Sequence, residues 1–123
     1  MRRASQELLV IDRTYELTKW YLGHLAKFPR SHRYTLGQRI EMRLYEVMES
    51  LVRAKYAERG AKTAHLSAVN LDLEILRMLS RLAHELQILP HKSHEYAVRE
   101  LNEIGRMVGG WLRQQQRPAS GTN

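Results

Sequence analysis

Apolar side chains recur every three or four residues in four separate blocks of this 123-residue sequence. That spacing places them along one face of an α-helix, and no block alternates with the period of two typical of a strand. Because the steps mostly alternate between three and four, neighbouring helices should cross at roughly 20°. The predicted core positions are Leu8, Ile11, Tyr15, Leu22 and Leu25, with Thr18 as a polar step; Leu36, Ile40, Leu44, Val47, Leu51 and Ala54; Leu66, Val69, Leu73, Leu76, Leu79, Ala83 and Leu86; and Ala97, Leu101, Ile104, Val108 and Trp111.

Turn and capping residues separate the blocks. Pro29 disfavours helix at the residue before it, and Thr35 with Gln38 has the spacing of a capping box. Gly60 suits the end of the second helix, and Pro90 closes the third. The predicted helices span approximately residues 5–27, 35–59, 64–89 and 93–115. Long helices with short connections pack as antiparallel neighbours, so the expected fold is all-α, an up-down-up-down four-helix bundle.

The bundle should form one domain over residues 1–116, because this length suits a single core. Residues 117–123 have little to bury, and we expect them to be a disordered tail. No apolar run reaches the roughly 20 residues needed to cross a bilayer, and no cysteine is present. A cytoplasmic protein without membrane contact is therefore expected.

The helices carry more apolar surface than one bundle needs. A second stripe lies opposite the core face of the second helix, and further apolar residues widen the face of the third. Large apolar patches usually mark an interface, although singly exposed apolar residues are normal. We expect contacts between subunits of a homo-oligomer at Leu9, Trp20, Tyr45, Met48, Val52, Tyr56, Leu71, Ile75 and Met78.

The charge of the chain points to an anionic partner. The net charge is +7, and such a balance favours nucleic acid, acidic protein surfaces or anionic lipid. From Lys27 to Arg43, five basic residues face a single acid, a net +4 within 17 residues. A solvated loop would have the same composition. The candidate nucleic-acid or partner-binding residues are Lys27, Arg30, Arg33, Arg39, Arg43, Arg53, Lys55, Arg59, Lys62, Arg77, Arg81 and Arg113.

The sequence offers no catalytic constellation. It lacks a glycine-rich phosphate loop and a paired metal-ligand motif, and His91 with His94 has no third ligand nearby in sequence. Asp72 falls on an apolar helix face, where a carboxylate needs a partner; we expect it to pair with an arginine. Neither an enzyme nor a cofactor or metal is expected.

The stretch "LLVIDRTYELTKWYLGHLAKFPRSHRYTLGQRIE", Leu8 to Glu41, resembles the accessory variability determinant (Avd) proteins of diversity-generating retroelements. The pattern "KFPRxxRYxLGxRI" carries most of the resemblance, which continues to about Trp111. A sister group of four-helix bundle proteins, encoded in intervening sequences of bacterial 23S ribosomal RNA genes, shares a looser form of this loop.

The resemblance implies a pentameric barrel of four-helix bundles. It also implies binding of RNA and DNA without strong sequence preference, and association with a reverse transcriptase during mutagenic copying of a template repeat. The first interpretation is thus a non-catalytic accessory protein that holds template RNA or complementary DNA. Two alternatives remain open, the ribosomal-RNA-associated bundle and a basic protein-interaction module that does not bind nucleic acid.

We expect the basic connection between residues 27 and 43 to have two roles, one in packing and one in binding. Phe28 and Leu36 are expected to pack over the end of the bundle. Arg30, Arg33 and Arg39 would then be displayed together for contact with phosphates.

Overall fold

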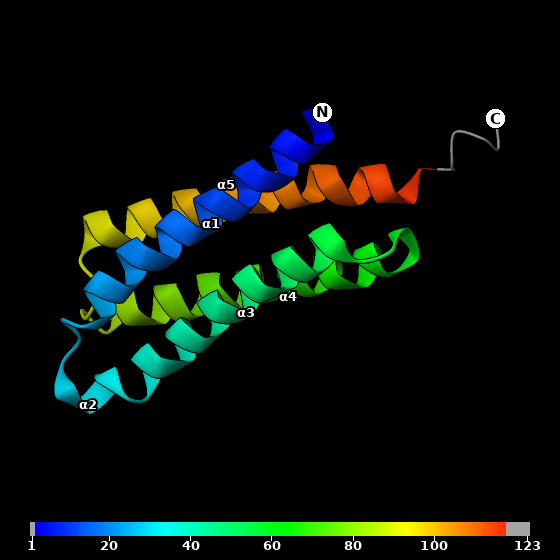
Figure 1. The fold of residues 1–123 in the computed structure, drawn as a ribbon. Helices are drawn as coiled ribbons and strands as arrows, with labels where there is room; N and C mark the ends of the chain where they lie inside the picture. Colours follow the sequence, from blue (N-terminus) through cyan, green and yellow to red (C-terminus); the bar gives the residue numbers. More distant parts are fainter. Residues whose placement is uncertain (1, 118–123) are drawn as a thin grey trace.

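The computed structural model describes residues 2–117, with side chains from residue 6 to residue 117. Its four long helices are α1 (Arg2–Leu25), α3 (Leu36–Tyr56), α4 (Arg59–Glu85) and α5 (His91–Gln116), and a single turn, α2 (Arg30–Arg33), lies between α1 and α3 (Figure 1). The described residues contain no strand, so the predicted all-α class is confirmed. Except for Arg117, the predicted disordered tail lies outside the described residues.

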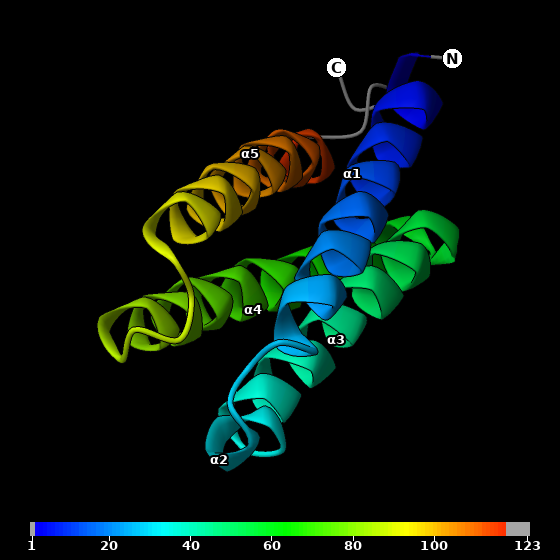
Figure 2. The same ribbon diagram turned by 90° about the vertical axis from the view of Figure 1, so that its left-hand side faces the viewer.

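The long helices form two layers, α1 with α5 and α3 with α4 (Figure 1). Each packs against two others: α3 against α1 and α4, and α5 against α4 and α1. One end of this bundle holds α2 and the α4–α5 turn, as Figure 2 shows. The α3–α4 turn lies at the opposite end. Among the described helices, none is long and apolar enough to span a membrane.

The core faces of α3 and α5 match the predicted ones. All six predicted positions of α3 and all five of α5 are buried. Most predicted positions of α4 are buried as well, but Leu79 is only half-buried and Leu86 is exposed. Leu86 follows the last residue of α4, and Gln87 then adopts a positive φ of 63°. The turn therefore carries Leu86 away from the core and buries Leu89 in its place.

The predicted core face of α1 is only partly correct. Thr18 and Leu25 are buried, and Ile11 and Leu22 pack half-buried against the core. Leu8 and Tyr15 are exposed, however, whereas Val10, Leu17 and Tyr21, which were not predicted, are buried. The hydroxyls of the two buried threonines donate to backbone carbonyls of α1 itself: Thr14 Oγ1 to Val10 O at 2.9 Å and Thr18 Oγ1 to Thr14 O at 2.8 Å. Because the helix satisfies these polar groups internally, they can be buried at little cost, and an apolar pattern alone does not locate the whole buried face.

A buried hydrogen bond ties α1 to α4. The Tyr21 hydroxyl lies 2.6 Å from Ser80 Oγ, and both side chains are fully buried. Burial raises the pKa of Tyr21 to about 12, and the hydrogen bond to Ser80 opposes this rise. The pair satisfies two polar groups that would otherwise be costly inside the core.

The predicted helix caps are also wrong. No side chain caps α3, and Thr35 Oγ1 instead makes a long 3.5 Å contact to Ser31 O. Gly60 lies in the first turn of α4 rather than after α3, which already ends at Tyr56. Lys62 closes this turn from the next helix, because its ammonium donates to Ala54 O at 2.6 Å and to Lys55 O at 3.0 Å. A cation at the last carbonyls of a helix satisfies them and complements the helix dipole.

Candidate nucleic-acid interface

The connection between α1 and α3 is built around one buried aromatic ring. Phe28 is 2% exposed and Leu36 is also buried, which confirms the predicted packing over the end of the bundle. The chain turns through bonds from Lys27 N to His24 O and from Phe28 N to Leu25 O, each 3.0 Å. Pro29 then starts α2. This arrangement fixes the path of the backbone that carries the basic side chains.

Gly37 lies where α2 and Phe28 meet the first turn of α3. A methyl group at this position would lie 3.4 Å from both the Phe28 ring and His32 O, within ordinary van der Waals contact. The two segments are therefore closely packed around Gly37.

Four basic side chains of this connection are available to a partner. Lys27, Arg30, Arg33 and Arg39 are all exposed, and none forms an ion pair with any carboxylate of the described residues. Arg33 Nη2 makes only a long 3.5 Å contact to Phe28 O. Their positive charge is therefore not neutralised within the described chain. Cations without an acidic partner are available to bind a phosphate.

Half of the other predicted basic residues have an acidic partner. Arg53 pairs with Glu49, and Arg81 pairs with Glu85, both within one helix. Such pairs are weak in water, but each carboxylate would still oppose an approaching phosphate.

Arg43 and Arg77 are engaged more deeply. Arg43 Nη1 lies 2.9 Å from Asp72 Oδ1 and 3.3 Å from Glu46 Oε1. Asp72 is buried. Arg43 is its predicted arginine partner, and it lies in the same chain. Arg77 bonds to Glu74 and to Asn102 Oδ1 on α5. We conclude that these two arginines hold helices together.

The basic residues around the α3–α4 turn, at the opposite end of the bundle, are only partly available to bind a partner. Lys62 is used at the α3–α4 turn, and Arg59 Nη2 donates to Arg117 O at 3.0 Å. Lys55 Nζ lies 4.4 Å from the centre of the Tyr56 ring. Arg113 is exposed. This end thus offers fewer cations free of protein partners than the α1–α3 connection.

A hollow lies beside α2, between α1 and α3. It has a volume of about 340 Å³ and is lined by Leu22, Leu25, Ala26, Arg33, Tyr34, Gln38, Glu41 and Met42. The Tyr34 ring at its side is 67% exposed, and Arg33 Cζ lies 6.0 Å from the ring centre. Sequence reasoning missed Tyr34, although an aromatic residue between basic ones was the available signal.

Glu41 gives this hollow one acidic group. The Tyr45 hydroxyl donates to Glu41 Oε2 at 2.7 Å. This hydrogen bond, followed by burial, raises the pKa of Tyr45. The Tyr45 side chain is half-buried, and its hydroxyl already has a hydrogen-bond partner in the same helix.

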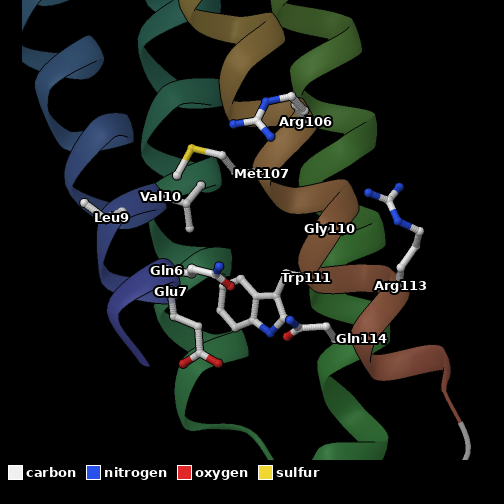
Figure 3. A pocket seen from close by; sticks show the side chains of 10 residues that line it. All are labelled: Gln6, Glu7, Leu9, Val10, Arg106, Met107, Gly110, Trp111, Arg113 and Gln114. Carbon is white, nitrogen blue, oxygen red and sulfur yellow. The ribbon is translucent and has the colours of Figure 1, made fainter. Parts of the chain in front are cut away.

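A second cavity of about 410 Å³ opens between the start of α1 and the end of α5 (Figure 3). The Trp111 indole lies across this space, while Arg113 points away from it. Trp111 Nε1 is buried and has no hydrogen-bond partner among the described residues. Arg106 at the rim is neutralised by Glu103. Arg113 is thus the one lining cation without a carboxylate partner among the described residues, whereas the α1–α3 connection has four such cations.

Three histidines gather at the α4–α5 turn. The His84 and His94 rings stack with their centres 4.6 Å apart, and His91 lies 5.5 Å from His84. Burial, and then the two neighbouring rings, lower the pKa of His94. Within residues 6–117, no three potential ligands are placed to hold a metal ion.

The predicted subunit-contact residues divide into two groups by exposure. Leu9, Val52, Tyr56, Leu71 and Met78 are exposed, as a contact surface requires. The half-buried ones are Trp20, Tyr45, Met48 and Ile75.

Trp20 does not lie on an outer face as predicted. Its ring packs on Tyr96 of α5, with ring centres 4.7 Å apart. The indole fills the contact between α1 and α5, because α1 is rotated from the predicted orientation.

A family model described as bAvd-like matches residues 8–115 of the chain. No curated protein matches it. The matched range contains all of α3, α4 and the α1–α3 connection, together with most of α1 and α5.

Proposed function

Because the chain belongs to the bAvd-like family, we propose that it is a non-catalytic accessory protein of a diversity-generating retroelement. In this role it would bind template RNA or complementary DNA and associate with the reverse transcriptase that copies it. No cofactor is needed for such a function.

One observation supports the nucleic-acid role above all others. Lys27, Arg30, Arg33 and Arg39 are exposed and lack a carboxylate partner among the described residues. Four of the other eight candidate cations are paired with carboxylates, and Arg59 and Lys62 donate to backbone carbonyls. Unpaired lysines and arginines bind phosphates by releasing counterions, which depends on charge and not on base sequence. We therefore assign the α1–α3 connection as the phosphate-binding surface.

The proposed assembly is a homo-oligomer, and the Avd resemblance makes it a ring of five copies. Exposed apolar side chains on α4 support subunit contacts: Leu71 is 63% exposed and Met78 is 57% exposed in the single chain. A ring would repeat the basic connection around its axis. Several copies could then bind one strand together and strengthen the binding of each weak site.

The test compares two triple variants that lose the same charge. One replaces Arg30, Arg33 and Arg39 with Gln; the matched control replaces Arg53, Arg81 and Arg106, each of which has a glutamate partner on its own helix. Affinity for single-stranded RNA, single-stranded DNA and duplex DNA is measured by fluorescence anisotropy over a range of salt concentrations.

We expect the loop variant to weaken binding to all three nucleic acids by similar factors. Its slope of log affinity against log salt should shrink by roughly 0.7 per lost contact on single strands. The control should retain most of its affinity and slope. Equal losses in both variants would show that total charge matters and the loop does not. An unmodified protein that binds no nucleic acid would favour the protein-interaction module instead.

A further inference from the structure

We propose that the hollow beside Tyr34 binds one unstacked base of a single-stranded nucleic acid, with the Tyr34 ring stacked on that base. The inference rests on the proposed nucleic-acid function and adds the substrate class to it. The α1–α3 connection would then favour single strands over duplexes, because only a single strand can present a base without breaking a pair.

The hollow has a suitable size and composition. Its volume of about 340 Å³ falls within the roughly 300–1,000 Å³ of small-molecule sites. Leu22, Leu25 and Met42 supply apolar lining, and Gln38 offers both a donor and an acceptor. A nucleic-acid base is a flat ring with polar edges, so its faces would contact the apolar side chains and its edge would reach Gln38.

Tyr34 is placed to act as a stacking platform. Its ring is 67% exposed, although the rest of the connection buries its large apolar groups. Base–aromatic stacking is tolerant of sequence, since every base has a π face. Arg33 Cζ lies 6.0 Å from the centre of the Tyr34 ring. At this distance its guanidinium could contact the phosphate next to a base stacked on Tyr34.

Two charged side chains line the hollow, Glu41 and Arg33. The Glu41 carboxylate accepts a hydrogen bond from the Tyr45 hydroxyl, and it would repel a phosphate that entered the hollow. The same carboxylate can accept a hydrogen bond from an N–H group on the edge of a base, including the N3–H of thymine. Lys27 and Arg30, exposed on the outer side of the connection, would meet the adjoining backbone.

The experiment uses two six-nucleotide probes with the same phosphates, an oligo-dT and an abasic tetrahydrofuran oligomer. Their affinities are measured with the full-length protein, and the ratio of the two reports the contribution of the bases alone. Variants are Tyr34→Leu, Tyr34→Phe, Tyr56→Leu and a double Gln variant at Arg30 and Arg39. Tyr15→Leu is a matched control, because Tyr15 is also exposed and has a cation, Lys19, 5.6 Å from its ring centre.

We expect oligo-dT to bind the unmodified protein at least about five-fold more tightly than the abasic probe, the lower range for one stacked base. Tyr34→Leu should bring this ratio close to one and leave the abasic affinity unchanged. Tyr34→Phe and Tyr15→Leu should keep the ratio. The double Gln variant should weaken both probes equally, because it removes phosphate contacts only and keeps Arg33 at the hollow.

Two results would overturn the inference while the proposed function stands: equal affinities for both probes in the unmodified protein, or an unchanged ratio in Tyr34→Leu. Loss of the ratio in Tyr56→Leu would also overturn it and move the base site to the opposite end, where Lys55 lies over that ring. Failure to bind either probe would overturn the inference and the proposed nucleic-acid function together.

Discussion

Replacing Phe28 with Ala should destabilise the protein strongly, because this ring anchors the basic connection to the bundle. The side chain is 2% exposed, and it packs closely against α3 at Gly37. Truncating a buried Phe to Ala typically costs about 3–5 kcal/mol. The ring lies at the end of the bundle, where the connection can partly collapse, so we expect the lower value of about 3 kcal/mol.

Thermal unfolding followed by circular dichroism gives the measurement. At about 2.1 cal/mol/K per residue, the 123 residues have an unfolding entropy of about 0.26 kcal/mol/K. A loss of about 3 kcal/mol therefore corresponds to a decrease in Tm of about 12 °C. All samples need the same protein concentration, since the Tm of an oligomer depends on it.

Tyr34→Ala is the control, because it removes a similar ring from the same connection where the ring is exposed. We expect its Tm to stay within about 2 °C of the parent, the range of surface substitutions. A Phe28→Ala variant that melts within a degree of the parent would refute the claim that Phe28 holds the connection in place.

Three further outcomes are expected. The pKa of Tyr21 is about 12 in the folded state and near 10 in the unfolded state. Between pH 10 and pH 12 the folded state therefore binds more protons than the unfolded state. The free energy of unfolding should fall over this range by up to about 1.4 kcal/mol per pH unit. Urea titrations of Tyr21→Phe should show a shallower fall. Gln87→Gly should raise Tm by about 4 °C, since glycine adopts the observed positive φ without strain of about 1 kcal/mol. The unmodified protein should be an oligomer by light scattering, and Leu71→Glu with Met78→Glu should reduce its mass toward the 14.5 kDa of one chain.

The fold of α3 and α5 could be predicted because their buried faces are entirely apolar. Ile40, Leu44, Val47 and Leu51 follow one another at steps of three and four, and all are buried. Periodicity is the strongest sequence signal when no polar residue interrupts it. The short connections then left few alternatives to an antiparallel arrangement.

The orientation of α1 could not be predicted in the same way. Its buried face includes Thr14 and Thr18, which satisfy their hydroxyls on the carbonyls of the helix itself. A sequence pattern shows that a residue is polar but not that its hydrogen bond is already made. Leu8 and Tyr15 match the apolar spacing of a core face, but both are exposed.

The candidate site was predictable in position but not in composition. The sequence located the basic connection and the packing of Phe28. It could not show that Arg43 pairs with Asp72, 29 residues away, because such pairing depends on how α3 lies against α4. The hollow beside Tyr34 depends on the turn at α2, which no capping or periodicity signal predicted.

Photo-crosslinking tests the central claim, that nucleic acid binds at the α1–α3 connection, most directly. A single-stranded RNA containing 4-thiouridine is crosslinked to the protein, which is then cleaved after glutamate and analysed by mass spectrometry. Cleavage after Glu16 and Glu41 releases the whole connection as one peptide, residues 17–41. The account predicts that most crosslinks fall in this peptide, with Tyr34 among the modified residues. Crosslinks confined to the peptides 50–58, 59–74, 75–85, 96–100 or 104–123 would place the nucleic acid at the opposite end or along α4 and α5, and would contradict the account.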